Sequence, residues 1–226
     1  MTVQNPVPGV SQQLIDELLR SPSLPQLTHE LQAVLKAEAA LRQQFYDQVS
    51  DQQKAEFING EVIVHSPVRL RHSHASENLF SLLQLYVRKH DLGYVGHEKL
   101  LIALTRNDYE PDICFFAKAK ADVFTPDQTK FPAPDFIVEV LSPATEEIDR
   151  GVKFKDYALH QVAEYWLVDA EAGSVEQYLL HDTEYKLEVK INAGTIRSQV
   201  IAGFEIPISA IFDAAQHLAA MSAILS

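Results

Sequence analysis

The stretch DFIVEVLSP, residues 135–143, decides the fold of this chain, because it combines a buried strand with a charge. Apolar residues surround Glu139 on both sides, and they are Phe136, Ile137, Val138, Val140 and Leu141. Such a run predicts a strand in the interior of a sheet. Side chains alternate along a strand, so Glu139 shares one face with Ile137 and Leu141. Because a buried carboxylate is costly unless it is paired, the sequence predicts a partner for Glu139.

Asp112 is the candidate partner, and it stands in YEPDICFFA, residues 109–117. Pro111 cannot donate a ladder hydrogen bond, which places Asp112 at the start of a second apolar strand. Two carboxylates on adjacent strands repel each other, and a hard divalent cation between them removes the repulsion. The pair therefore predicts a Mg²⁺ site. The alternative is a simple turn residue, since Asp is common in turns.

The segment DRGVKFKDYALH, residues 149–160, predicts the helix that follows the Glu139 strand. Lys153 and Tyr157 are four residues apart, and Arg150 is three before Lys153, so an α-helix would place all three on one face. A lysine beside a metal site can orient a nucleophile and stabilise charge on phosphorus. The alternatives are a solvated lysine and a tyrosine that only packs its ring.

The remaining patterns predict an α/β protein with a mixed β-sheet flanked by helices. The pair Asn59-Gly60 predicts a hairpin, because both turn positions need a positive φ. Helical periodicity predicts a short helix in SQQLIDELL, a long amphipathic helix over residues 27–50 and another helix over about 72–90. We expect an N-terminal helical extension (residues 1–48), a core (49–213) and a C-terminal helix (214–226).

The composition narrows the class of protein. The 226 residues carry a net charge of −12, which argues against broad, non-specific binding of nucleic acid. The net charge does not exclude local basic strips that could contact nucleic acid, such as Arg69, Arg71 and His72. The chain has one cysteine, Cys114, no run of about 18 apolar residues and no signal-peptide pattern at its N-terminus, so we expect a cytoplasmic protein without a membrane span.

Four blocks carry a family resemblance: YEPDICFF, PDFIVEVLSP, DRGVKFKDYA and AEYWLVD. They resemble the core blocks of the Uma2 family of endonucleases, within the PD-(D/E)XK restriction-endonuclease-like superfamily. The resemblance covers roughly residues 50–213. It implies a restriction-endonuclease-like fold and hydrolysis of DNA phosphodiester bonds with Mg²⁺, for which Mn²⁺ can substitute. It also implies a homodimer, because two DNA strands require two cuts.

The resemblance assigns roles to single residues. Asp112 corresponds to the aspartate of the PD motif and Glu139 to the (D/E) position, and the backbone carbonyl of Val140 would be a further metal ligand. The superfamily lysine should stand two residues after Glu139, where this chain has Leu141. The resemblance therefore implies that Lys153, on the next helix, takes its place.

Two further residues belong to the predicted site by resemblance. Glu56 matches the glutamate before the family's hairpin turn, and His72 matches the histidine that opens its first core helix. The alternatives for Glu56 are an exposed hairpin residue or a cross-strand partner. The alternative for His72, with which His74 competes, is a helix-start residue that caps or packs locally. Tyr157 and Arg150 are expected to support the site.

Two other functions remain open from the sequence. A protein that keeps the fold but only binds a partner would suit the net charge of −12 and the missing lysine. A metal-dependent hydrolase of small phosphoesters would use the same carboxylates. The sequence does not distinguish DNA from RNA, nor does it specify a target sequence or a cleavage pattern.

Overall fold

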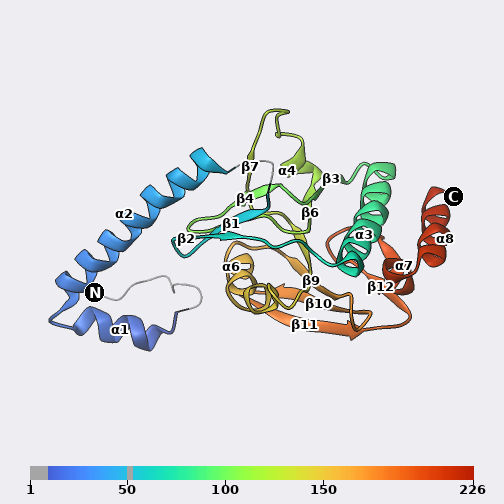
Figure 1. Cartoon of the computed structure of the whole chain (residues 1–226). Coiled ribbons are helices and arrows are strands. Elements are labelled where there is room, and N and C mark those ends of the chain that lie inside the picture. Colours follow the sequence, from blue (N-terminus) through green and yellow to red (C-terminus); the bar gives the residue numbers. More distant parts are fainter. Residues whose placement is uncertain (1–9, 50–52) are drawn as a thin grey trace.

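The structure is a computed structural model that describes residues 10–49 and 53–226 (Figure 1). Its helices are α1 (Gln12–Arg20), α2 (Leu24–Gln48), α3 (Leu70–Lys89), α4 (Lys118–Ala121), α5 (Glu146–Ile148), the π-helical turn η1 (Asp149–Lys153), α6 (Phe154–Leu159), α7 (Ser209–Phe212) and α8 (Ala214–Leu225). None of the helices in this part of the chain is long and apolar enough to span a membrane.

The strands form three sheets. They are β1 (Ala55–Ile58), β2 (Glu61–Val64), β3 (Gly93–His97), β4 (Leu101–Ala103), β5 (Asp108–Tyr109), β6 (Ile113–Ala117), β7 (Lys130–Phe131), β8 (Phe136–Val140), β9 (Glu164–Asp169), β10 (Ser174–His181), β11 (Glu184–Ile191), β12 (Thr195–Arg197) and β13 (Glu205–Pro207). The orders are β2-β1-β5-β4-β7, β11-β10-β9-β8-β6-β3 and β12-β13.

The six-stranded sheet is mixed, which confirms the predicted α/β fold with helices on its faces. Strands β8 and β9 are parallel, with Phe136 opposite Glu164, and all other pairs in this sheet are antiparallel. A parallel pair needs a crossover connection. Here α5, η1 and α6 provide it, so the helix that carries Lys153 follows directly from the end of the Glu139 strand.

The two faces of β8 enter different cores, as the alternation of its side chains predicts. Val138 and its neighbours on the same face pack with α3, α7 and α8 in one apolar cluster. Ile137, on the other face, packs in a second cluster with Tyr157 of α6 and Tyr165 of β9. Glu139 shares the face of Ile137 and lies at the end of this second core.

The predicted hairpin is confirmed and carries Glu56. Asn59 and Gly60 have φ angles of 51° and 88°, and β1 pairs with β2 from Ala55 opposite Val64 to Ile58 opposite Glu61. The five-stranded sheet that contains this hairpin lies beside the six-stranded sheet, and all four residues of β1 are buried. This burial overturns the reading of Glu56 as an exposed hairpin residue.

The N-terminal helices pack on the core over only part of their length. Near the C-terminal end of α2, Phe45 is buried and Arg42 forms two hydrogen bonds of 2.6 and 2.7 Å with Asp108. Leu31 and Leu35, earlier on the same helix, stay exposed, and α1 has no buried residue. Figure 1 shows α1 and the first turns of α2 extending away from the sheets.

Candidate metal centre

Four of the predicted site residues meet in an open pocket of about 550 Å³. The pocket lies where the start of β6 meets the end of the antiparallel strand β8, and Asp112, Glu139, Lys153 and His72 are among its lining residues. Asp112 and Glu139 are 4% and 2% exposed, so two carboxylates lie almost fully buried at the floor of a pocket that opens to solvent.

Asp112 stands just before β6 and bridges this strand to β8. Its Oδ2 accepts a hydrogen bond of 2.8 Å from the backbone N–H of Val140. Its own backbone N–H donates to Glu139 Oε2 at 3.3 Å. The carboxylates of Asp112 and Glu139 are therefore neighbours, as predicted, and the backbone of Val140 lies against them.

Lys153 reaches back from η1 to the Glu139 strand, which confirms the geometry required by the absent lysine at position 141. Its Nζ lies 2.9 Å from Glu56 Oε1, 3.0 Å from Glu139 Oε1 and 3.1 Å from Asp149 Oδ1. Tyr157 also donates to Glu139 Oε1, at 3.1 Å. Since Lys153 is 1% exposed, its amine is fully engaged with three carboxylates.

Glu56 joins the centre from β1, as its resemblance to the family glutamate implies. Its Oε1 accepts from the backbone N–H of Glu110 at 2.9 Å, and its Oε2 lies 2.9 Å from His65 Nε2. Burial alone would raise the pKa of Glu56, but Lys153 and His65 outweigh it and lower the pKa to about 2. Glu56 is thus an ionised counter-charge for Lys153.

The two carboxyls of the central pair respond to their surroundings in opposite directions. Burial raises the pKa of Glu139 to about 8, with Asp149 and Asp112 adding repulsion that Lys153 only partly offsets. Burial also acts on Asp112, but Lys54 outweighs it and holds the pKa of Asp112 below its usual range. The pair therefore divides into one firmly ionised carboxylate and one that holds a proton near neutrality.

Arg150 does not join the site, and its predicted place on the face of Lys153 is wrong. Its guanidinium pairs with Glu146 at 2.8 Å and with Glu176 at 2.7 Å, outside the pocket. The reason is the π-helical turn η1, whose i→i+5 hydrogen bonds change the spacing that holds in an α-helix. The same turn aims Asp149, which the sequence analysis missed, at Lys153.

Two basic partners, Lys54 and His65, were also missed. Lys54 lies directly before β1, and its Nζ is 2.6 Å from Asp112 Oδ1. His72 contributes a second contact to Asp112, with Nε2 at 3.4 Å from Oδ2, and is 6% exposed, whereas His74 is not among the lining residues. Lys54 and His65 flank the strands of a hairpin, where a polar residue carries no pattern that marks it in the sequence.

The donor set fits a hard cation that retains water ligands. Asp112, Glu139 and the carbonyl oxygen of Val140 offer oxygen atoms only, and Mg²⁺ is commonly held by one or two carboxylates with water and substrate phosphates. In the described ranges 10–49 and 53–226, no group of three or more His, Cys, Asp or Glu could hold an ion alone.

A second observation supports the fit. Within the part of the chain that the structure describes, the buried His72 Nδ1 has no hydrogen-bond partner. His72 lines the same pocket as Asp112 and Glu139. An unsatisfied buried group is uncommon in native proteins, and a catalytic role or a bound ion or water is among its explanations.

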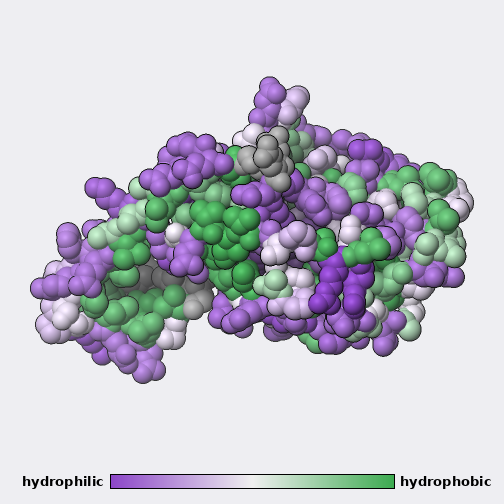
Figure 2. All heavy atoms as spheres, in the orientation of Figure 1, coloured by the Kyte–Doolittle hydropathy of each residue, from purple (hydrophilic) through white to green (hydrophobic). Residues whose placement is uncertain are grey.

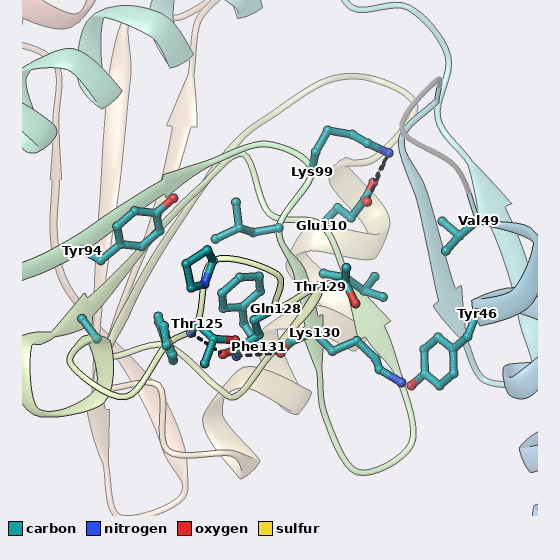
Figure 3. A pocket seen from close by; sticks show the side chains of 15 residues that line it. Tyr46, Val49, Tyr94, Lys99, Glu110, Thr125, Gln128, Thr129, Lys130 and Phe131 are labelled. Carbon is teal, nitrogen blue, oxygen red and sulfur yellow. Dashed lines mark hydrogen bonds and ion pairs between the residues drawn. The ribbon is translucent and has the colours of Figure 1, made fainter.

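A larger pocket, of about 760 Å³, lies elsewhere and lacks this chemistry (Figure 3). It is lined by aromatic and aliphatic side chains together with Lys99 and Lys130. The Lys130 amine stands 3.9 Å from the centre of the Tyr46 ring, and Lys99 pairs with Glu110. None of the predicted site residues lines it. The size of a pocket is therefore a poor guide to the reactive centre in this chain.

Comparison with known proteins agrees with the resemblance. The Uma2 family, described as "Putative restriction endonuclease", matches residues 42–209. The uncharacterized protein sll1609 of Synechocystis sp. (strain ATCC 27184 / PCC 6803 / Kazusa) is 32% identical over 130 residues, which cover 56% of this chain and 72% of that protein.

A solved structure shares the fold. It is the crystal structure of a nuclease, described as putative and as belonging to DUF820, from Anabaena variabilis ATCC 29413. The two structures superpose with a TM-score of 0.65 at 18% sequence identity, covering 76% of this chain and 96% of the other. Since the family match extends over most of the chain and includes Asp112, Glu139 and Lys153, this protein belongs to the Uma2 family.

Proposed function

We propose that this chain is a metal-dependent nuclease that hydrolyses DNA phosphodiester bonds, with Mg²⁺ or Mn²⁺ held by Asp112, Glu139 and the carbonyl oxygen of Val140. The observation that carries the proposal is the pair of buried carboxylates, from adjacent strands, on the floor of an open pocket. When bound, the ion supplies Lewis-acid activation of water and phosphate oxygens. The family description and the shared fold support the reaction class.

The lysines of the centre have different roles in this proposal. Lys153 is enclosed by carboxylates and acts as a positioning residue, because its hydrogen bond fixes the orientation of Glu139. The Lys54 side chain is 21% exposed and lines the pocket. Once Asp112 has another counter-ion, the Lys54 amine is free to pair with a phosphate oxygen of the substrate.

A nucleic-acid substrate is supported by two arginines on the rim of the pocket. Arg69 and Arg71 both line it, and their side chains are 64% and 48% exposed. Each pairs with Glu171, at 3.9 and 3.3 Å. Such exposed ion pairs are weak, so a DNA phosphate can replace Glu171 as their partner. Local contacts of this kind are compatible with a net charge of −12.

The direct test is a plasmid-cleavage assay with Mg²⁺ and with Mn²⁺. The wild type is expected to nick or linearise the plasmid, and Asp112→Asn is expected to lose at least about a hundredfold in rate, as the loss of a metal ligand requires. Asp127→Asn, an exposed carboxylate outside the pocket, is the matched control and is expected to cleave like the wild type. Equal cleavage by Asp112→Asn would reject the assigned centre.

The pocket volume favours one second candidate, a hydrolase of small phosphoesters. A volume of about 550 Å³ lies within the range of small-molecule sites. The same preparation can be assayed with nucleotides and with bis(p-nitrophenyl) phosphate. Turnover of these compounds without cleavage of DNA would favour this candidate. Failure to bind metal or to cleave any phosphoester would favour an interaction protein that keeps the nuclease fold.

A further inference from the structure

The arm formed by α1, residues 21–23 and the first turns of α2 up to residue 37 has an apolar face that no residue of the described ranges 10–49 and 53–226 covers fully. Large apolar side chains on the arm and its surroundings are between 39% and 62% exposed, and these ten are Val10, Leu14, Leu18, Leu19, Leu31, Val34, Leu35, Leu41, Val62 and Val64. Figure 2 shows hydrophobic side chains gathered over the arm and beside it. Exposed apolar patches of about this size are often functional, and protein–protein contact is one of their common roles.

The sequence of α2 has the spacing of a helix that packs against another helix. Residues 24, 27, 31, 34, 38, 41 and 45 alternate steps of three and four, and all are apolar except Glu38. This is the a/d pattern of a coiled coil. The stripe ends on the protein's own core, where Phe45 is 4% exposed and Glu38 pairs with Arg106. In its first half, Leu31 and Val34 are 62% and 50% exposed.

We propose that this face is the surface through which two copies of the chain associate, with the arm of each copy packed against the arm of the other. An apolar stripe is complementary to a second copy of itself. A two-fold axis therefore buries the same surface of each copy against that of the other.

The exposed area matches what a stable dimer needs. Half-exposed aliphatic side chains offer about 50 Å² each, or about 500 Å² in total for the ten residues. Homodimer interfaces are about 65% apolar, so this corresponds to about 750 Å² on each copy. Specific interfaces of standard size bury about 800 Å² per partner.

The charge of the arm favours a second copy over nucleic acid. Residues 10–37 contain three acids (Asp16, Glu17, Glu30) and two bases (Arg20, Lys36), a net charge of −1 within a chain of −12. Two acidic copies can therefore approach through this nearly neutral region with little repulsion. Binding of DNA through the arm would require basic side chains for the phosphates, and the arm offers too few.

The centre described above is separate from this surface, since none of the residues that line the metal pocket lies on the arm. The proposal therefore does not depend on the nuclease proposal. Variants of the arm are expected to leave metal binding unchanged, which provides an internal check that they fold.

The test is the molar mass of the full chain by light scattering after size exclusion, over a series of micromolar concentrations. The wild type is expected at twice the 25.4 kDa mass of one chain. The double variant Leu31→Glu with Leu35→Glu is expected at the mass of one chain, because it places four charges in the symmetric interface. Its far-ultraviolet circular dichroism and its metal binding are expected to match the wild type.

Two matched controls carry the same change at exposed apolar residues away from the arm. Val123→Glu and Leu218→Glu, at positions 74% and 64% exposed, are expected to stay dimeric. Mixing two differently tagged wild-type copies is expected to give a co-purified pair, and the arm variant is expected to abolish it. A monomeric wild type, or a dimer that survives both arm substitutions, would overturn the proposal.

Discussion

Two buried glutamates on the adjacent strands β8 and β9 are stabilised against the cost of burial by different kinds of partner. Glu164 is fully buried and accepts hydrogen bonds of 2.6–2.9 Å from five neutral donors, which are the side chains of Trp166, Gln177 and Ser198 and the backbone N–H groups of Gln199 and Val200. Glu139 is 2% exposed and is held by the Lys153 amine, the Tyr157 hydroxyl and one long backbone contact of 3.3 Å.

The difference separates a structural carboxylate from a candidate reactive one. The oxygens of Glu164 are saturated by donors that tie β9 to the segment around Ser198, so no ligand can use them. Glu139 keeps one weakly engaged oxygen on an open pocket and depends on cations for compensation. Burial of a carboxylate therefore does not identify a functional site. Partial saturation beside a pocket is the more specific sign.

The largest effect is expected from Lys153→Met. Removal of Lys153 leaves the buried charge of Glu56 uncompensated and takes the ammonium contact away from Glu139 and Asp149, and breaking a buried ion pair typically costs about 3–5 kcal/mol. The free energy of unfolding, from urea denaturation, is the measurement. We expect Mg²⁺ to restore part of the loss, since a divalent cation replaces the missing charge. A variant as stable as the wild type, or one insensitive to Mg²⁺, would contradict the account.

Glu164→Ala is expected to lower the free energy of unfolding somewhat less than Lys153→Met does, by on the order of 3 kcal/mol, because buried donors lose their acceptor. This loss should be independent of Mg²⁺, in contrast to that of Lys153→Met. Glu188→Ala, an exposed glutamate on β11, is the matched control and is expected to stay within about 0.5 kcal/mol of the wild type. Rescue of Glu164→Ala by Mg²⁺ would mean that the two glutamates do not differ as described.

The pH dependence of metal binding tests the surroundings described for Glu139. The pKa of Glu139, about 8 against an ordinary value of 4.5, means that a cation must displace a proton below pH 8. The apparent affinity for Mg²⁺ should therefore rise with pH by up to about tenfold per unit and level off above pH 8. Calorimetry in buffers of different ionisation enthalpy measures the proton released. Binding that weakens as the pH rises towards 8 would contradict this.

The same shift has a consequence for the protein without metal. Because the folded-state pKa of Glu139 lies above its ordinary value, folding favours the protonated form. The stability that this group contributes is fully present below pH 4.5 and is lost as the pH rises through 8.

The smallest effect is expected from Lys54→Ala. The Lys54 amine lies 2.6 Å from Asp112 Oδ1, so it competes with a metal ion for this oxygen. Its removal should tighten Mg²⁺ binding by about threefold to tenfold, as one competing charge near the surface allows. Cleavage of DNA should fall at the same time, because the amine no longer reaches the phosphate. Weaker metal binding in Lys54→Ala would show that the lysine assists the ion rather than competing with it.

Much of the fold and the central pair of the site followed from local patterns. The apolar run around Glu139 specified β8, Asn59-Gly60 specified the β1–β2 turn, and Pro111 placed Asp112 at a strand start. Gln161, just after α6, adopts a φ of 61°, so the left-handed end of this helix forms without the glycine that usually favours it.

Other features were missed, and some of them depend on tertiary structure that no local pattern reports. A π-helical turn stands where an α-helix was expected, and Arg150 points away from the site. Asp149 lies four residues before Lys153, a spacing that an α-helix would also place on one face, so the sequence held this signal. Lys54 is a partner of Asp112 because the start of β1 and the start of β6 lie close together in space. The exposed first half of α2 has the same periodicity as its buried end, so the sequence predicts a packed stripe without specifying its partner.

The central claim is that Asp112 and Glu139 form a metal centre, and calorimetric titration with Mg²⁺ and Mn²⁺ tests it most directly. We predict that the wild type binds at least one ion and that Asp112→Asn and Glu139→Gln each lower the affinity by about a hundredfold or more. Glu164→Gln, which changes the neighbouring structural glutamate, should bind like the wild type. A wild type that binds no ion, or a Glu139→Gln variant that binds as well as Glu164→Gln, would contradict the account.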